Sequence, residues 1–234
     1  MISRGFFLMW CLLVNPFAFG QVGSWTVLSA KVGLSPNWSM FGEAQLRSTS
    51  FFQNFHYYEY KGGGTFHVDK NFSVALAAGR YTTFQQGGNF LEPEVNDEFR
   101  LWQQLVVSEY LERIRIEHRY RLEQRWTSTG FRTRYRFRVN VTVPLNQRKL
   151  EPGVWYVSAG NEVFLTDRPT YFERNRFTLA IGQQVTHQLT CYAGYVYQFD
   201  YRTDNETGIR FFQVGCQFDF KRPSGREQIP SQQD

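Results

Sequence analysis

The chain has 234 residues, a formal net charge of +5, 18% aromatic and 20% charged side chains, and a mean hydropathy of −0.45. No apolar stretch after residue 20 approaches the roughly 20 residues that a helix needs to span a bilayer, which excludes a bundle of membrane-spanning helices. Three cysteines are too few for a disulfide-built scaffold. A composition rich in aromatic residues but polar on average is instead typical of an outer-membrane β-barrel.

The first twenty residues have the pattern of an export signal. Arg4 precedes an apolar run over 6–14, and a small-x-small motif follows at 18–20. We predict that residues 1–20 form a cleaved secretory signal peptide. Removing it leaves 25 basic against 21 acidic residues, a net charge of +4. Export and this mild charge together argue against nucleic acid as a partner.

Two-residue alternation of polar and apolar side chains recurs along the mature chain. Eleven such segments lie at about 24–34, 37–47, 55–67, 72–84, 97–108, 111–126, 131–143, 154–165, 174–185, 189–201 and 209–220. Most can cross a bilayer at a tilt, which takes about 9–11 residues. Residues 21–220 are therefore predicted to form an all-β fold, an antiparallel transmembrane up-and-down β-barrel of 10–12 strands. A soluble periplasmic β-sandwich is the alternative, and 221–234 is expected to be a disordered tail.

The connections between these segments are expected to alternate in length. Short ones are expected at 35–36, 68–71, 109–110 and 186–188, and longer ones at 48–54, 85–96, 167–173 and 202–208. Outer-membrane barrels have short periplasmic turns and longer outer loops, so this phase predicts that the first strand begins at the outer end. The long stretch at 144–153 is an exception.

The densest basic stretch is RIRIEHRYRLEQRWTSTGFRTRYRFRVNVTVP at 113–144. Its nine arginines form two runs with steps of two or four positions: Arg113, Arg115, Arg119, Arg121 and Arg125, then Arg132, Arg134, Arg136 and Arg138. A period of two collects them on one face of two strands, whereas a helical period scatters them. Each would cost about 2–4 kcal/mol facing lipid near the midplane, so we expect them to line the barrel interior.

Arginines in a barrel interior need anionic partners. The inward parity of the strands supplies Glu117 and Glu123 beside the arginines and Glu43, Glu59, Glu98 and Glu162 on other strands. With Arg174 and Arg176 as further members, these residues are predicted to form a charge network in the lumen. In a barrel of this size the long side chains predict a narrow or closed lumen.

No catalytic, cofactor-binding or metal-binding residues emerge from the sequence. His118 has the lipid-facing parity of its strand, and His187 lies in a short turn. His67 could meet Glu59 and Glu43 in the lumen, although a packed polar interior explains these residues equally well. The remaining carboxylates lack the spacing of a metal site and are better interpreted as arginine partners.

The two cysteines of the mature chain lie on the last two strands. Cys191 and Cys216 are nearly equidistant from a loop near residue 205, so they are expected to be cross-strand neighbours. An oxidising periplasm would permit a disulfide. We favour two free thiols on the lipid face, because adjacent-strand disulfides are often strained.

Several of these residues carry a family resemblance. The motifs are HRYRLEQR at 118–125, RYR at 134–136, Asn161-Glu162 with Phe164, RNR at 174–176, and Trp25, Glu43 and Arg47 near the mature start. They resemble the recurring motifs of the domain of unknown function 2490 family. The resemblance implies an outer-membrane-type β-barrel from a Gram-negative bacterium, common in the Bacteroidota, and it implies no activity.

Three functions are compatible with this reading. The first is a structural or accessory outer-membrane barrel, not an enzyme, with its lumen plugged by an Arg–Glu network. The alternatives are a narrow, porin-like anion-selective channel and a barrel enzyme acting on lipid or peptide. The expected partners are outer-membrane lipid and, as a candidate ligand, a small anion.

Overall fold

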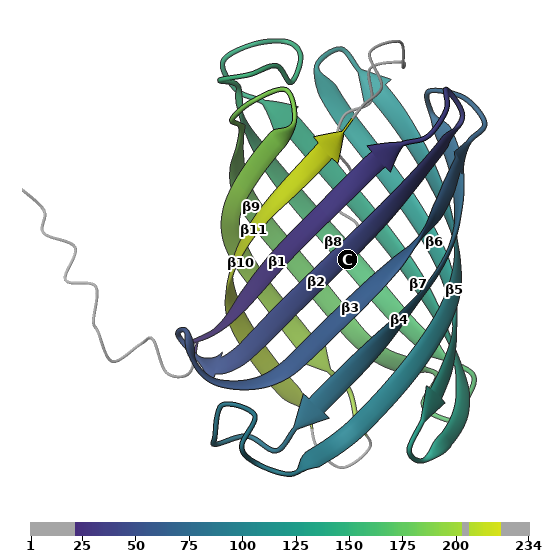
Figure 1. The fold of residues 1–234 in the computed structure, drawn as a ribbon, viewed down its shortest axis with the longest axis vertical. Coiled ribbons are helices and arrows are strands. Elements are labelled where there is room, and N and C mark those ends of the chain that lie inside the picture. The colour runs from purple at the N-terminus through teal and green to yellow at the C-terminus, as the bar shows by residue number, and fades with distance from the viewer. Residues whose placement is uncertain (1–21, 203–205, 221–234) are drawn as a thin grey trace, which may run out of the picture.

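The computed structural model describes residues 22–202 and 206–220, and these residues form an all-β structure (Figure 1). Its strands are β1 (Val22–Gly33), β2 (Trp38–Ser50), β3 (Gln53–His67), β4 (Phe72–Phe84), β5 (Glu94–Leu111), β6 (Ile114–Thr127), β7 (Gly130–Pro144), β8 (Trp155–Thr166), β9 (Phe172–Gln184), β10 (Leu189–Asp200) and β11 (Thr207–Phe220). No helix long and apolar enough to cross a membrane occurs in these two ranges. The predicted signal peptide, 1–20, and the predicted tail, 221–234, lie outside them.

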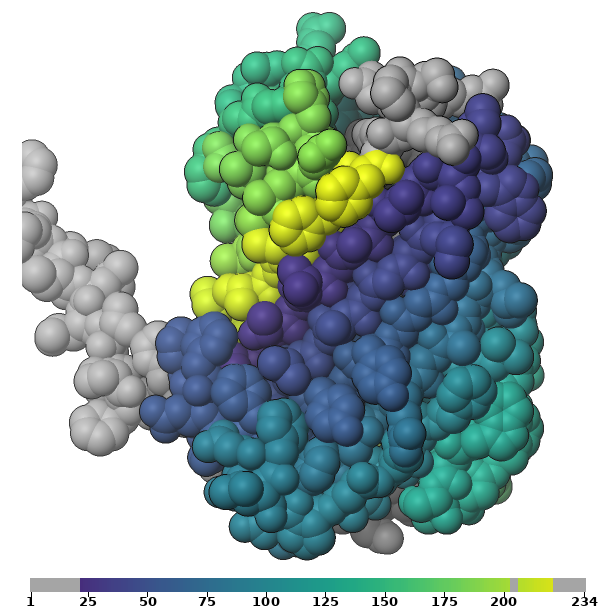
Figure 2. Space-filling model, in the orientation of Figure 1, coloured from purple at the N-terminus to yellow at the C-terminus, as the bar shows by residue number. Residues whose placement is uncertain are grey.

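The strands close into a single barrel in sequence order. Every neighbouring pair is antiparallel except β1 and β11, which run parallel from Val22 opposite Arg210 to Val32 opposite Phe220. Figure 1 shows these two arrows pointing the same way, and Figure 2 shows the yellow side chains of β11 packed directly against the purple ones of β1. The predicted all-β barrel of 10–12 strands is confirmed, with eleven strands among the described residues.

Side chains alternate between the interior and the outer surface along each strand, as a period of two requires. On β6 the odd-numbered residues from Arg115 to Arg125 are buried, while Tyr120 and Trp126 are exposed on the outer face. The alternation also decides which of two neighbouring residues of β4 faces the interior. Tyr81 is buried in the interior, whereas Arg80 is exposed and pairs with Asp97.

The connections depart from the expected alternation of lengths. Those at the lower end of Figure 1 include 51–52, 85–93, 128–129 and 167–171. Those at the upper end are 34–37, 68–71, 112–113, 145–154 and 185–188. The expected long loop at 48–54 is only the turn 51–52, because β2 and β3 extend into it. The turn expected at 109–110 lies at 112–113, where Glu112 has a φ of 53°.

Three pairs of strands shift register near the lower end. The shifts fall at Arg47/Ser48 in β2, at Thr83/Phe84 in β4 and at Phe164/Leu165 in β8. A bulge adds one residue to a strand and re-aims the side chains beside it. The extra residues are His56 on β3, Val95 on β5 and Glu173 on β9, since their neighbours pair directly across each bulge.

Candidate functional site

The buried network occupies the middle of the barrel, and its arginines come mainly from β6 and β7. Period-two geometry places Arg119, Arg121, Arg134, Arg136 and Arg138 on the inner faces of these strands, where each is less than one-tenth exposed. Such burial requires paired charges. Buried carboxylates provide the paired negative charges.

Glu123 on β6 is the central acceptor. Its side chain is fully buried, and it accepts hydrogen bonds from Nε and Nη2 of Arg134 at 2.9 and 2.6 Å. Arg136 Nη1 donates to its other oxygen at 2.7 Å. Arg121 Nη1 lies 3.6 Å from Glu123 Oε1. One carboxylate therefore holds three guanidinium groups from two adjacent strands.

Glu162 on β8 is a second acceptor of the same kind. Arg136 Nε donates to Oε1 at 2.8 Å and Nη2 to Oε2 at 3.0 Å, a bidentate contact. Arg119 Nη2 donates to Oε1 at 2.6 Å, and Arg176 Nη1 lies 3.7 Å from Oε2. Arg136 bridges Glu123 and Glu162, so the two clusters form one network.

Toward the lower end, Glu98 and Glu173 connect opposite parts of the wall. Glu98 on β5 accepts two hydrogen bonds from Arg100, at 2.8 and 2.9 Å, and also pairs with Arg125. Arg125 Nη1 reaches Glu173 on β9 at 3.4 Å, and Arg134 Nη1 reaches it at 3.0 Å. This contact spans the lumen from β6 to β9, which are not neighbours in the sheet.

On the β2–β3 wall a lysine is the central group. Lys61 Nζ lies 2.6 Å from Glu43 and 2.8 Å from Glu59, with all three side chains buried. Glu59 also accepts from Tyr57 and, at 3.2 Å, from Arg47. The Arg47 guanidinium stacks on Trp25, 3.6 Å from the ring centroid.

A smaller cluster lies nearer the upper end. Arg115 Nη2 donates to Glu117 at 2.7 Å, and Arg138 Nη2 donates to the other oxygen of Glu117 at 3.2 Å. Across the lumen, aromatic rings fill the space beside the charges. Phe41 on β2 and Trp102 on β5 approach to 5.8 Å between ring centroids.

The buried charged side chains carry more positive than negative charge. Among the described residues, ten Lys and Arg side chains are buried against seven Asp and Glu side chains, a surplus of three cations. Aromatic rings offset part of the cost, because a guanidinium over a ring face is attracted to the ring quadrupole. Arg121 lies 4.0 Å from the centroid of Trp102, and Arg136 lies 4.6 Å from that of Phe164.

Three arginines expected in the network lie elsewhere or differ in their partners. Arg113 is exposed in the turn 112–113, because β6 begins one residue later, at Ile114. Arg132 is half-buried at the lower end of β7 and donates to Thr129 Oγ1 at 3.2 Å. Arg174 is half-buried and pairs with Asp200 rather than with one of the expected glutamates.

The histidine cluster considered from the sequence does not form. His67 ends β3 at the upper end and contacts Ser39 Oγ at 2.9 Å. Glu59 lies eight positions earlier on the same strand, about 26 Å away at 3.3 Å per residue. Glu43 belongs to the Lys61 cluster. In the described ranges no three His, Cys, Asp or Glu side chains are grouped to hold a metal ion.

Besides Arg47, which was named only as a family motif, sequence reasoning missed four charged members of the network. Lys61 and Arg100 follow Glu59 and Glu98 by two positions, so the same parity could have found them. Glu173 has outward parity and turns inward only because of the bulge in β9. Asp200 pairs with Arg174 at the end of β10.

Cys191 and Cys216 are direct partners across β10 and β11. Both are half-buried on the outer face, and both are free thiols in the structure. Ala193 and Val214, two positions along each strand, pair in the same register and share this face.

The fold and the network define a class of protein: a closed up-and-down β-barrel with a charged interior. The chain belongs to the family described as protein of unknown function (DUF2490), whose model matches residues 22–208. The predicted family membership is therefore confirmed. No curated protein and no solved structure matches the chain.

Proposed function

We propose that this chain is an outer-membrane β-barrel of a Gram-negative bacterium, with a structural or accessory role and a lumen closed to ions. The outer face supports membrane insertion. Large apolar side chains such as Leu28, Leu76 and Leu179 are about half exposed there, as the lipid-facing surface of a barrel requires. The predicted signal peptide provides the export that such a location needs.

Aromatic residues gather toward both ends of the outer face. Trp38 and Phe66 are in contact at the upper end, with ring centroids 5.0 Å apart. Trp126 and Phe131 are in contact at the lower end, at 5.3 Å. Two aromatic girdles at the membrane interfaces are a feature of outer-membrane barrels, so this arrangement supports the proposal.

One observation supports the closed lumen: ion pairs, together with a cation–π contact at Trp25, continue from strand to strand around the interior. Arg176 links Trp25 to Glu162, Arg136 links Glu162 to Glu123, and Arg134 links Glu123 to Glu173. Arg125 then joins Glu173 to Glu98. A hydrated ion that crosses the lumen at this level would have to displace these contacts.

Planar-bilayer recording of the purified full chain tests this proposal. Wild-type protein is expected to give no current steps, while the double variant Arg136→Ala/Glu162→Ala, which removes a neutral pair and its side-chain volume, is expected to pass ions. Porin-level steps from the wild type would contradict the closed lumen. Heat-modifiable migration on gels verifies that both proteins are folded.

A narrow anion-selective channel is the second candidate, favoured by the surplus of three buried cations. It requires a wild-type current that prefers anions and loses that preference when Arg134 and Arg136 are both changed to Gln. A silent wild type, or a preference for cations, rejects this second candidate.

A further inference from the structure

We propose that the lower end of the barrel contains a binding site for a small oxoanion, a molecule bearing a carboxylate or phosphate group. A cavity of about 270 Å³ lies there between the network and the lower rim. Side-chain exposure rises in this direction, from 0% at Glu123 to 15% at Asp200 and 25% at Glu173. The cavity therefore opens at this end.

The cavity wall has a strong excess of positive charge. Eight Lys and Arg side chains line it, against four Asp and Glu side chains. All four carboxylates are already held by arginine or lysine: Glu59, Glu98, Glu173 and Asp200. A cavity with surplus guanidinium groups and low-dielectric walls concentrates anions.

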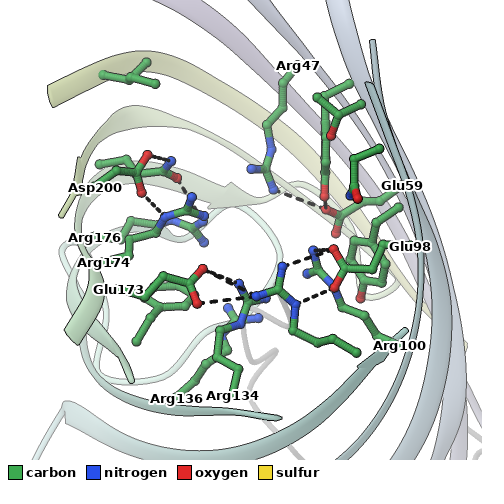
Figure 3. A pocket seen from close by; sticks show the side chains of 18 of the residues that line it. Arg47, Glu59, Glu98, Arg100, Arg134, Arg136, Glu173, Arg174, Arg176 and Asp200 are labelled. Atoms are coloured by element: carbon green, nitrogen blue, oxygen red, sulfur yellow. Dashed lines mark hydrogen bonds and ion pairs between the residues drawn. The ribbon is translucent and has the colours of Figure 1, made fainter. Parts of the chain in front are cut away.

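Two guanidinium groups provide the specific contacts. Arg47 on β2 and Arg176 on β9 pack against the same indole ring, with their Cζ atoms 3.6 and 4.7 Å from the centroid of Trp25. Figure 3 shows both extending toward the central space from different walls. Like charges held against one ring repel each other, and an anion between them would relieve that repulsion.

Both groups also have unused donors. Arg176 Nε and Arg47 Nε are buried, and neither has a hydrogen-bond partner. The same is true of His56 Nδ1, which the bulge in β3 brings to the cavity. Buried donors without partners are uncommon and costly. Planar guanidinium groups match the two oxygens of a carboxylate or phosphate, so an oxoanion would satisfy these donors together.

The size of the cavity limits the ligand. At about 270 Å³ it is below the usual range of drug-sized pockets, about 300–1,000 Å³. It can accept an inorganic oxoanion or a short dicarboxylate. Its wall is predominantly polar, which excludes a lipid tail as the part that enters.

The test is isothermal titration calorimetry of the detergent-solubilised full chain with inorganic phosphate and, separately, with succinate. At least one of them is expected to bind saturably with one site per chain. Arg176→Gln and Arg47→Gln are each expected to weaken that binding at least tenfold. Arg80→Gln, which removes an exposed arginine from the outer face, is the matched control and should leave it unchanged.

Arg176→Lys keeps the positive charge but removes the Nε donor. It therefore separates the effect of the charge from that of the hydrogen bonds. Its affinity should fall between those of the wild type and Arg176→Gln. If a variant does not fold, wild-type thermal unfolding still decides, because a ligand that binds only the folded state raises the Tm with concentration. No saturable binding and no rise in Tm with either anion, or equal binding by all four folded variants, would overturn the site. Conductance plays no part in this measurement, so the site and the closed lumen are tested independently.

Discussion

The sharpest test of the network is to neutralise its central carboxylate with Glu123→Gln. The glutamine has nearly the same shape, so the packing is preserved while the charge is removed. It keeps one acceptor oxygen for the three hydrogen bonds that Arg134 and Arg136 now donate. Its amide group would face these guanidinium groups with donors of its own. The surplus of buried cations rises from three to four.

Removing one partner of a buried ion pair costs about 3–5 kcal/mol, because the other charge stays buried without compensation. We expect Glu123→Gln to lower the free energy of unfolding by about that amount. Reversible urea unfolding in lipid vesicles, followed by tryptophan fluorescence, measures it. Asp97→Asn is the matched control, since it breaks an exposed pair with Arg80 and should have a much smaller effect. A Glu123→Gln cost no larger than that of Asp97→Asn would refute the reasoning.

Three further predictions concern single positions. Gly63→Ala should destabilise the barrel by about 1–3 kcal/mol through overpacking, because a Cβ there would collide with Ala77. A Cβ at Gly64 would meet open space, so Gly64→Ala should be nearly neutral. Equal urea midpoints for the two variants would contradict this prediction. Trp25→Phe removes the 2.8 Å hydrogen bond to Gln45 and the larger ring under Arg47 and Arg176, and should cost about 1–3 kcal/mol in the same unfolding assay. Finally, alkylation of unreduced, denatured protein should label both Cys191 and Cys216, and mass spectrometry showing neither thiol labelled would reveal a disulfide.

The sequence was most informative where the alternation is unbroken. On β6 and β7 the apolar residues must face outward and the arginines inward, so parity alone predicts the positions of Arg119, Arg121, Arg134 and Arg136. Each of them also lies several residues from a turn, away from the rims of the barrel. The strand boundaries were less predictable. A shift of the β5–β6 turn by a few residues was enough to expose Arg113.

Pairing across the lumen could not be predicted in the same way. Parity gives the face of a side chain but not its height in a tilted barrel, which depends on the register of every intervening strand. This is why the Arg125–Glu173 contact was not foreseen. Glu173 adds a second difficulty, since its inward position results from a bulge that is not evident in the sequence pattern.

The parallel pairing of β1 with β11 has a consequence for how the chain would sit across a membrane. An odd number of crossings means that Val22 and Phe220 emerge on opposite sides, whichever end of the barrel faces outward. A barrel made only of hairpins can insert from one side while both ends of its chain stay on that side. Here one end of the chain has to cross the bilayer. An epitope placed before Val22 and another after Phe220 would therefore never be exposed together on intact cells.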